Sequence, residues 1–155
     1  MDFDRYREEV DANRRTHGFD TVDERESAFG RLWSTHEEDQ TVGSVSLLAT
    51  VTDADSHDAA DVVDDADRFR RTLAAVTDDG ENTTPIGYLV FALPEPDDDI
   101  VSAATSYTVA ERRTNVFPLV YDTSAETLHI HPVPRLKGRG IYRRQADDAE
   151  RLFEV

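Results

Sequence analysis

The sequence predicts a single-domain α+β protein with a sheet of about four strands and helices packed mainly on one face. Three observations lead to this prediction. Apolar runs of strand length recur along the chain, apolar residues in 56–76 have helical spacing, and short turn-rich segments separate these elements. The length of 155 residues fits one domain over 1–155, with a helical N-terminal segment over 1–35 and an α+β core over 42–155.

Two strands near the C-terminus are predicted to form a hairpin. From Asn115 to Tyr121 both alternating sets of side chains are mostly apolar, which is typical of a strand covered on two faces. From Thr127 to His131 apolar and polar residues alternate, so we expect one exposed face. The segment 122–126 between them is polar and rich in turn-closing residues. Pro118 has no N–H to donate, so it must lie at a bulge or face away from a neighbouring strand.

The middle of the chain alternates between strand and helix patterns. Val45 to Val51 and Ile86 to Leu93 are predicted strands, both mostly apolar. Between them, 56–76 places its apolar residues on one helical stripe with Asp and Arg around the rest. This βαβ-like order makes a three-layer α/β sheet the alternative architecture.

The ends of the chain are predicted to be helical. Apolar residues recur at helical spacing in 3–15 and again in 21–33, and Trp33 is expected to anchor these helices on the sheet. A last short helix is predicted over Gln145 to Phe153. Residues 97–113 fit both a helix and an alternating strand, but acids at the front and arginines at the back match the helix macrodipole and favour a helix.

The composition is strongly acidic and lacks cysteine. The chain has 33 Asp and Glu against 17 Lys and Arg, which gives a formal net charge of -16. This composition resembles that of proteins from salt-loving archaea, in which salt screens the repulsion between acidic side chains on the surface. Without cysteine, disulfides and thiolate chemistry are excluded. No apolar run has the length of a membrane span or of a signal peptide, so we expect a cytoplasmic protein.

One short segment departs from this acidity. Five cations occur between residues 135 and 144 with no acid among them, and we predict that they bind an anion: Arg135, Lys137, Arg139, Arg143 and Arg144. Glycines in the same segment suit a loop whose backbone N–H groups approach a ligand closely, and arginine suits phosphate or carboxylate. The alternative is internal, because these cations can pair with the chain's own acids at Asp61, Asp64 or Asp147.

An Asp-x-Asp sequence follows the predicted strand Val45 to Val51. The string Leu47 to Ser56 resembles the first motif of haloacid-dehalogenase-type phosphatases. The resemblance implies a nucleophile at Asp53 and a general acid at Asp55, beside a magnesium ion. That family also uses a lysine, and here the only lysine is Lys137. The alternative is that these acids cap the helix that follows.

His129 and His131 form a possible partial metal site. Two residues apart on a strand, they would share one face about 7 Å apart at the Cα atoms. A metal needs at least a third ligand from elsewhere, so the alternative is a half-exposed polar face and we predict no metal or other cofactor.

The sequence favours a non-catalytic binding or regulatory module that uses its basic segment for an anionic ligand or an acidic partner. A small magnesium-dependent phosphoester hydrolase using Asp53 and Asp55 is the first alternative. A weak nucleic-acid binder comes second, because most of the surface would repel phosphates. A homodimer is compatible with the sequence.

Overall fold

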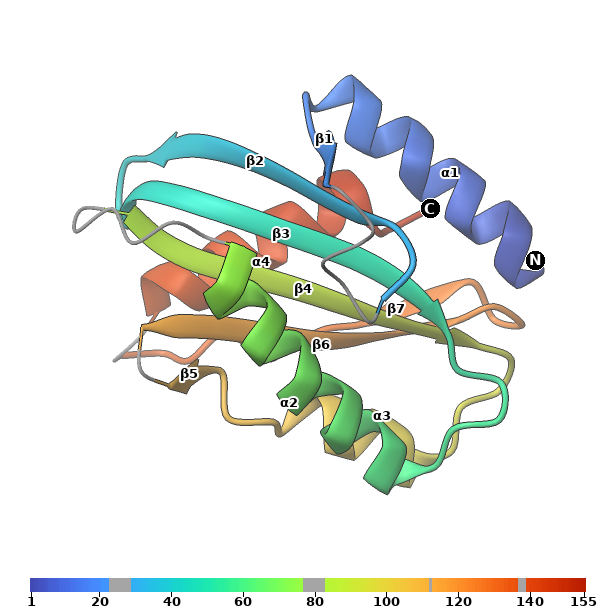
Figure 1. The fold of residues 1–155 in the computed structure, drawn as a ribbon. Coiled ribbons are helices and arrows are strands. Elements are labelled where there is room, and N and C mark those ends of the chain that lie inside the picture. The colour runs from blue at the N-terminus through green and yellow to red at the C-terminus, as the bar shows by residue number, and fades with distance from the viewer. Residues whose placement is uncertain (23–28, 77–82, 112, 137–138) are drawn as a thin grey trace.

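The computed structural model describes residues 1–22, 29–76, 83–111, 113–136 and 139–155. Within these ranges the chain forms four helices and a seven-stranded mixed sheet, with helices on both faces (Figure 1). The predicted α+β class and single-domain organisation are confirmed. The predicted number of about four strands is too low.

The sheet has a parallel centre and antiparallel margins. Its strand order is β1-β2-β3-β4-β6-β5, and β7 also pairs with β6. The pairs β3/β4 and β4/β6 are parallel, and the other pairs are antiparallel. The strands are β1 (Asp20–Val22), β2 (Leu32–Asp39), β3 (Gly43–Asp53), β4 (Thr83–Leu93), β5 (Ala110–Glu111), β6 (Thr114–Asp122) and β7 (Thr127–His129).

All four predicted strands are present, as β3, β4, β6 and β7. The three additional strands β1, β2 and β5 lie at or near the sheet edges. The predicted helix over 21–33 is wrong where the structure describes it, because β1 ends at Val22 and β2 begins at Leu32; residues 23–28 lie outside the described ranges. Trp33 is nevertheless a core residue, only 2% exposed. The helical N-terminal segment therefore reduces to α1 (Phe3–Thr16), which Asp2 caps by accepting the N–H of Arg5.

Two helices cover each face of the sheet. On one face, α2 (Ala59–Val76) and α3 (Asp98–Thr105) bury Phe69 and Ile100 against residues such as Leu89. On the other, α1 and α4 (Arg139–Leu152) bury Tyr6 and Leu152 with the opposite side chains of the same strands. The expectation of helices mainly on one face is therefore wrong, and the layers follow the three-layer alternative. A central strand that is apolar on both sides needs cover on both sides.

Residues 97–113 contain both of the predicted structures in succession. Asp97 caps α3 by accepting the N–H of Ile100 at 2.9 Å, as the acidic start predicts. The helix ends at Thr105, and the β-branched residues that follow lead into β5. The acidic start of the segment is therefore part of a helix as predicted, whereas the arginines at its back lie beyond the helix end, and the strand in its described residues is limited to Ala110–Glu111.

Pro118 lies where no strand pairs with its side of β6. The N–H of Val116 donates to the carbonyl of Val109, on the side away from β4. Pro118, two residues later, faces the same way, and there β5 has ended and β7 has not begun. The carbonyl of Pro118 is bonded instead to the imidazole Nε2 of His131 at 3.0 Å. The missing N–H of the proline therefore costs no ladder hydrogen bond.

None of the described helices combines the length and the apolar character that crossing a membrane would require.

Gly87 allows α2 to approach the central strand β4 closely. A Cβ atom at this position would lie 2.6 Å from Cε1 of Phe69 and 3.2 Å from Cδ2 of Leu73. We expect Gly87→Ala to lower the free energy of unfolding by about 1–3 kcal/mol, because the added methyl overpacks this contact. Urea unfolding measures the change. Gly30→Ala is the control, since no atom of the described residues lies within 4 Å of its added Cβ. Equal stability of the two variants would contradict the close approach.

Candidate functional site

The structure places the five predicted anion-binding cations in three settings: exposed (Arg135, Arg139 and Arg143), buried (Arg144) and outside the described residues (Lys137). Arg135 lies in the segment before α4 and is exposed, and Lys137 lies outside the described residues. Arg139 begins α4, so the prediction of a basic loop is wrong for residues 139–144, which are helical. Gly140 lies within this helix, where the missing side chain lets α4 approach Thr41 closely. An added Cβ would lie 2.8 Å from Cγ2 of Thr41.

Arg144 points into the protein and is paired internally. Its guanidinium donates to Asp148 through Nε at 2.9 Å, to Asp39 through Nη1 at 3.2 Å, and to Glu37 through Nη2. Its side chain is only 9% exposed. With three carboxylates around it, Arg144 is a structural residue, and the prediction that it binds an external anion is wrong in this structure.

The partners of Arg144 are themselves held by further donors. Asp148 also accepts the Tyr88 hydroxyl at 2.5 Å and Nε of Arg151 at 3.0 Å. Arg151 reaches Glu37 as well, with Nη1 at 3.1 Å from Oε2. This set of residues, which we call the α4 network, consists of Glu37, Asp39, Tyr88, Arg144, Asp148 and Arg151. It joins α4 to β2 and β4.

The pKa values of Glu37 and Asp39, the two network carboxylates on β2, are both lowered. Burial alone would raise the pKa of Glu37, but hydrogen bonds and charges from Arg151 and Arg144 outweigh it and lower the pKa overall. The pKa of Asp39 is lowered first by the backbone N–H of Val42, against the effect of burial, with further contributions from the Thr41 N–H and Arg144. Both groups therefore stay ionised at neutral pH.

Sequence reasoning missed the α4 network, although one signal was present. Arg144, Asp148 and Arg151 are spaced i, i+4 and i+7, which places them on one helix face. The predicted helix began only at Gln145, which left Arg144 in the basic segment and separated it from Asp148 and Arg151. On β2, Glu37 and Asp39 alternate with exposed residues, as a strand requires. Because both are acids, the sequence did not indicate that their side chains face inward.

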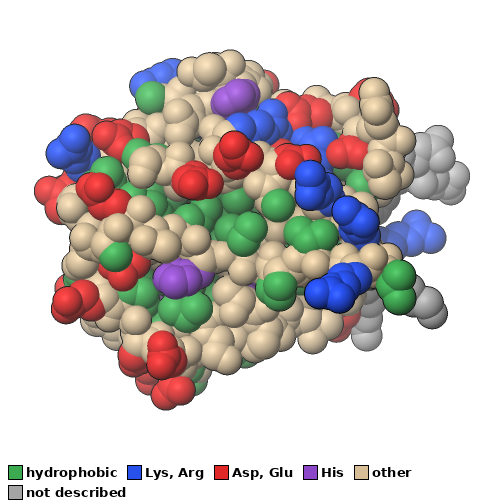
Figure 2. Space-filling view, turned by 180° about the vertical axis from the view of Figure 1, so that it is seen from behind, with side chains coloured by type: hydrophobic (Ala, Val, Ile, Leu, Met, Phe, Trp, Pro, Cys, Tyr) green, Lys and Arg blue, Asp and Glu red, His purple; other side chains and the backbone are tan. Residues whose placement is uncertain are grey.

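Three arginines remain on the outside, and we call them the basic surface: Arg135, Arg139 and Arg143. All three are exposed and form no ion pair within the described part of the chain. Leu136, between the first two, is 87% exposed. Figure 2 shows most Lys and Arg side chains of this view gathered on one side, with acidic side chains spread over much of the rest.

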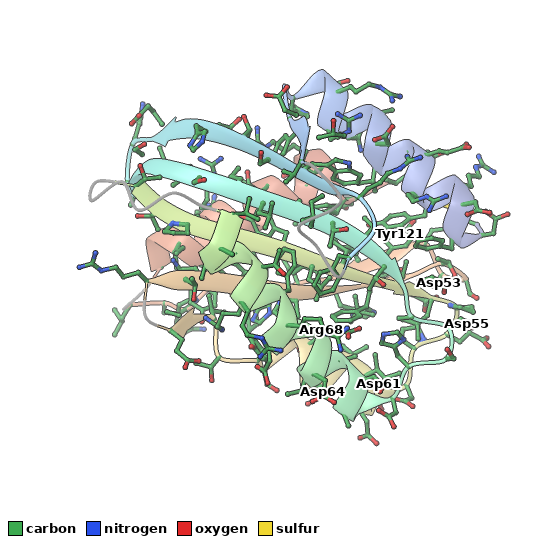
Figure 3. All side chains as sticks on the ribbon, in the orientation of Figure 1. Asp53, Asp55, Asp61, Asp64, Arg68 and Tyr121 are labelled. Carbon is green, nitrogen blue, oxygen red and sulfur yellow. The ribbon has the colours of Figure 1, made fainter. Side chains whose placement is uncertain are left out.

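The acidic start of α2 is too far away to neutralise the basic surface. Gly140 contacts the turn before β3, whereas Asp53 ends that strand eleven residues later. At 3.3 Å per residue these ends are roughly 30 Å apart. Figure 3 shows Asp61 and Asp64 on α2, toward the Asp53 end. Asp61, Asp64 and Asp147, the partners that the internal alternative requires, form no ion pair with the basic surface in the described residues.

Asp53 ends β3, and Asp55 lies in the turn that follows it (Figure 3). The Oδ1 atom of Asp53 accepts the N–H of Asp55 at 3.1 Å, which closes an Asx turn. The helix cap is one turn further on: Asp58 and Asp61 each accept the other's N–H, at 2.8 and 3.0 Å. In the described residues, no group of three His, Asp or Glu side chains is placed to hold a metal ion. The magnesium-dependent hydrolase remains the alternative hypothesis.

His129 and His131 have different environments. His129 is the last residue of β7 and is partly exposed. His131 is buried, its Nε2 donates to the Pro118 carbonyl, and its backbone N–H donates to Oε1 of Gln145 at 2.7 Å. Burial lowers the pKa of His131, so its imidazole is neutral. The expectation of a shared half-exposed face is wrong for His131, because its ring closes the open edge of β6.

The α4 network makes stability depend on acid pH. Glu37 and Asp39 have folded-state pKa values below their ordinary 4.5 and 3.8, so their contribution is present above these values and is lost as pH falls through the folded values. We expect Arg144→Met to cost about 3–5 kcal/mol at pH 7, because it removes a buried cation that three carboxylates share and leaves Asp39 without an ion pair in the described residues. Urea unfolding at several pH values should show this difference shrinking below about pH 4.

Arg143→Met is the matched control for this prediction. It removes the same group one residue away, from an exposed side chain with no ion pair in the described residues. It should change the free energy of unfolding by less than about 0.5 kcal/mol. If both variants lose the same free energy at every pH, the α4 network does not hold the helix.

The chain was also compared with known proteins. No family model matches it, and neither the curated proteins nor the solved structures contain a match.

Proposed function

We propose that the protein is a non-catalytic binding module whose basic surface holds an acidic segment of a partner protein. The observation that carries this proposal is the contrast within α4. Arg144 is surrounded by three carboxylates, whereas Arg139 and Arg143 on the same helix have none in the described residues. In a chain of net charge -16, arginines without an internal partner are available for an external one.

The exposed Leu136 supports a protein partner over a small anion. A leucine that is 87% exposed offers apolar contact area beside the cations. Protein interfaces combine apolar contact with arginine, whereas a phosphate or sulfate gains nothing from a leucine. A nucleic acid would also have to extend along a surface that is acidic beyond this patch, which would repel its phosphates.

The surrounding acidity does not prevent binding of an acidic segment at moderate salt. The Debye length is about 8 Å at physiological ionic strength and about 3 Å in molar salt, so distant carboxylates are screened at both, while cations in direct contact are screened less. The acidic segment of the partner that contacts the basic surface should therefore be short. A long polyanion would meet the acidic surface and bind less well.

We expect Arg135→Ala with Arg139→Ala to weaken binding of a fluorescent Asp/Glu-rich peptide by about tenfold. Each lost exposed ion pair contributes up to about 1 kcal/mol, so the loss of two is enough to reach the roughly 1.4 kcal/mol of a tenfold change. Fluorescence anisotropy measures the affinity. Arg31→Ala with Arg71→Ala is the control, because it makes the same charge change at exposed arginines elsewhere.

Two results would contradict this proposal. One is equal weakening by both double variants, which would reflect net charge alone. The other is a lower melting temperature of the Arg135/Arg139 variant in dilute buffer, which would mean that these arginines neutralise the protein itself.

We also propose that the acidic surface is an adaptation to high salt. The support is the net charge of -16. We expect the melting temperature to rise from dilute buffer to molar KCl, because the Debye length falls to about 3 Å and repulsion between carboxylates is screened. The triple variant Asp64→Asn, Asp147→Asn and Glu150→Gln removes exposed acids that form no ion pair in the described residues. It should melt higher in dilute buffer and respond less to KCl. A melting temperature independent of salt would contradict the proposal.

A further inference from the structure

We propose that a hollow beside the basic surface receives an aromatic side chain of the bound acidic segment. The hollow lies between the end of α3 and the segment 131–134, and its volume is about 430 Å³. This inference rests on the proposed function and names the partner more closely: an acidic polypeptide segment with an aromatic residue next to its acids.

The walls of the hollow suit a flat apolar group. They include the rings of Tyr107, Tyr142, Pro132 and Pro134 and the side chain of Val133. Aromatic and proline rings present flat surfaces on which another aromatic ring stacks. The volume falls within the range of about 300–1,000 Å³ that is typical of sites for small ligands. The hollow therefore has room for one large side chain.

The floor of the hollow is held in place and carries no charge. The His131 ring is fixed by the Pro118 carbonyl and packs edge-on to Phe117, with ring centroids 5.4 Å apart. Its imidazole is neutral, because burial lowers its pKa. Tyr142 packs edge-on to the same Phe117 ring, also at 5.4 Å. Walls that are already ordered lose little entropy when a ligand enters.

The ligand must bind by a side chain and not as an added strand, because the edge of β6 at Pro118 cannot pair with another strand. Pro118 has no N–H to offer, and its carbonyl is already bonded to His131. Strand addition needs free N–H and C=O groups along an edge. The mode of binding is therefore a side chain in a pocket.

The charges nearby indicate which residues flank that side chain. Pro134 lines the hollow and Arg135 follows it, while Tyr142 lines the hollow and Arg143 follows it. A ligand with an aromatic residue in the hollow would thus place its neighbouring residues against arginines. Carboxylates at those neighbours complement the arginines. The Tyr142 hydroxyl has no hydrogen-bond partner in the described residues and can donate to the ligand.

Two peptides test the inference. Both are short, rich in Asp and Glu and labelled with the same fluorophore; one carries a central phenylalanine and the other an alanine. On the wild-type protein we expect the phenylalanine peptide to bind at least tenfold more tightly, since burial of one such ring is worth this factor. Fluorescence anisotropy gives both affinities.

A blocking variant with a matched control locates the effect. Ser106 is exposed and lines the hollow, so Ser106→Trp should fill the hollow from the surface without disturbing the core. It should abolish the advantage of phenylalanine and leave the alanine peptide unchanged. Ser102, one turn earlier on α3, is exposed and does not line the hollow. Ser102→Trp should leave both affinities as in the wild type.

The possible failures are distinguishable. If both peptides bind equally to the wild type, the hollow is not a subsite, and the proposed function stands. If neither peptide binds, the proposed function fails as well. Tighter binding of a single-stranded oligonucleotide than of either peptide would overturn the class of partner. Analytical ultracentrifugation tests a further alternative. If the wild type self-associates and Ser106→Trp does not, the hollow binds a second copy of this chain and not an acidic peptide.

Discussion

The docking of α4 depends on the buried carboxylate of Asp148. Three donors from two elements meet there: the Tyr88 hydroxyl from β4, and Arg144 and Arg151 from α4 itself. A buried carboxylate needs such donors, because without them its desolvation would cost several kcal/mol. Arg144 and Arg151 then extend the contact to Glu37 on β2. The rotation of α4 about its axis is thereby set, since only one face carries these residues.

The basic surface follows from that rotation. With Arg144 turned inward, Arg143 and Arg139 are directed outward, and the chain before the helix brings Arg135 to the same region. The same rotation places Tyr142 beside His131, with ring centroids 6.4 Å apart, at the rim of the hollow. One polar interaction inside the protein thus determines where its exposed cations and its apolar hollow lie.

The elements that follow apolar periodicity could be predicted from the sequence, and the elements stabilised by charge could not. Phe69 and Leu73 mark α2 by their spacing, and the apolar strands around Leu89 and Val120 needed no further signal. Glu37 was different, because an acid on the inward face of a strand looks like a loop residue. Its partner Arg144 lies 107 residues away, and no local pattern joins residues that far apart. For the same reason the basic segment could be noticed from sequence, but its division into buried and exposed arginines could not.

The short strands at the sheet margins bear on how the protein avoids aggregation. In the described residues, the outermost strands β1, β5 and β7 have three, two and three residues. Between β5 and β7, Pro118 and His131 leave no pair of free backbone groups on β6 for a second molecule to join. Brief edges and an edge proline are features that keep sheets from growing across molecules. At the other margin, within the described residues, β1 covers only Leu32 to Ser34 of β2. The rest of that edge, from Thr35 to Asp39, is rich in acids, and charged side chains on an edge strand also disfavour pairing with a second molecule.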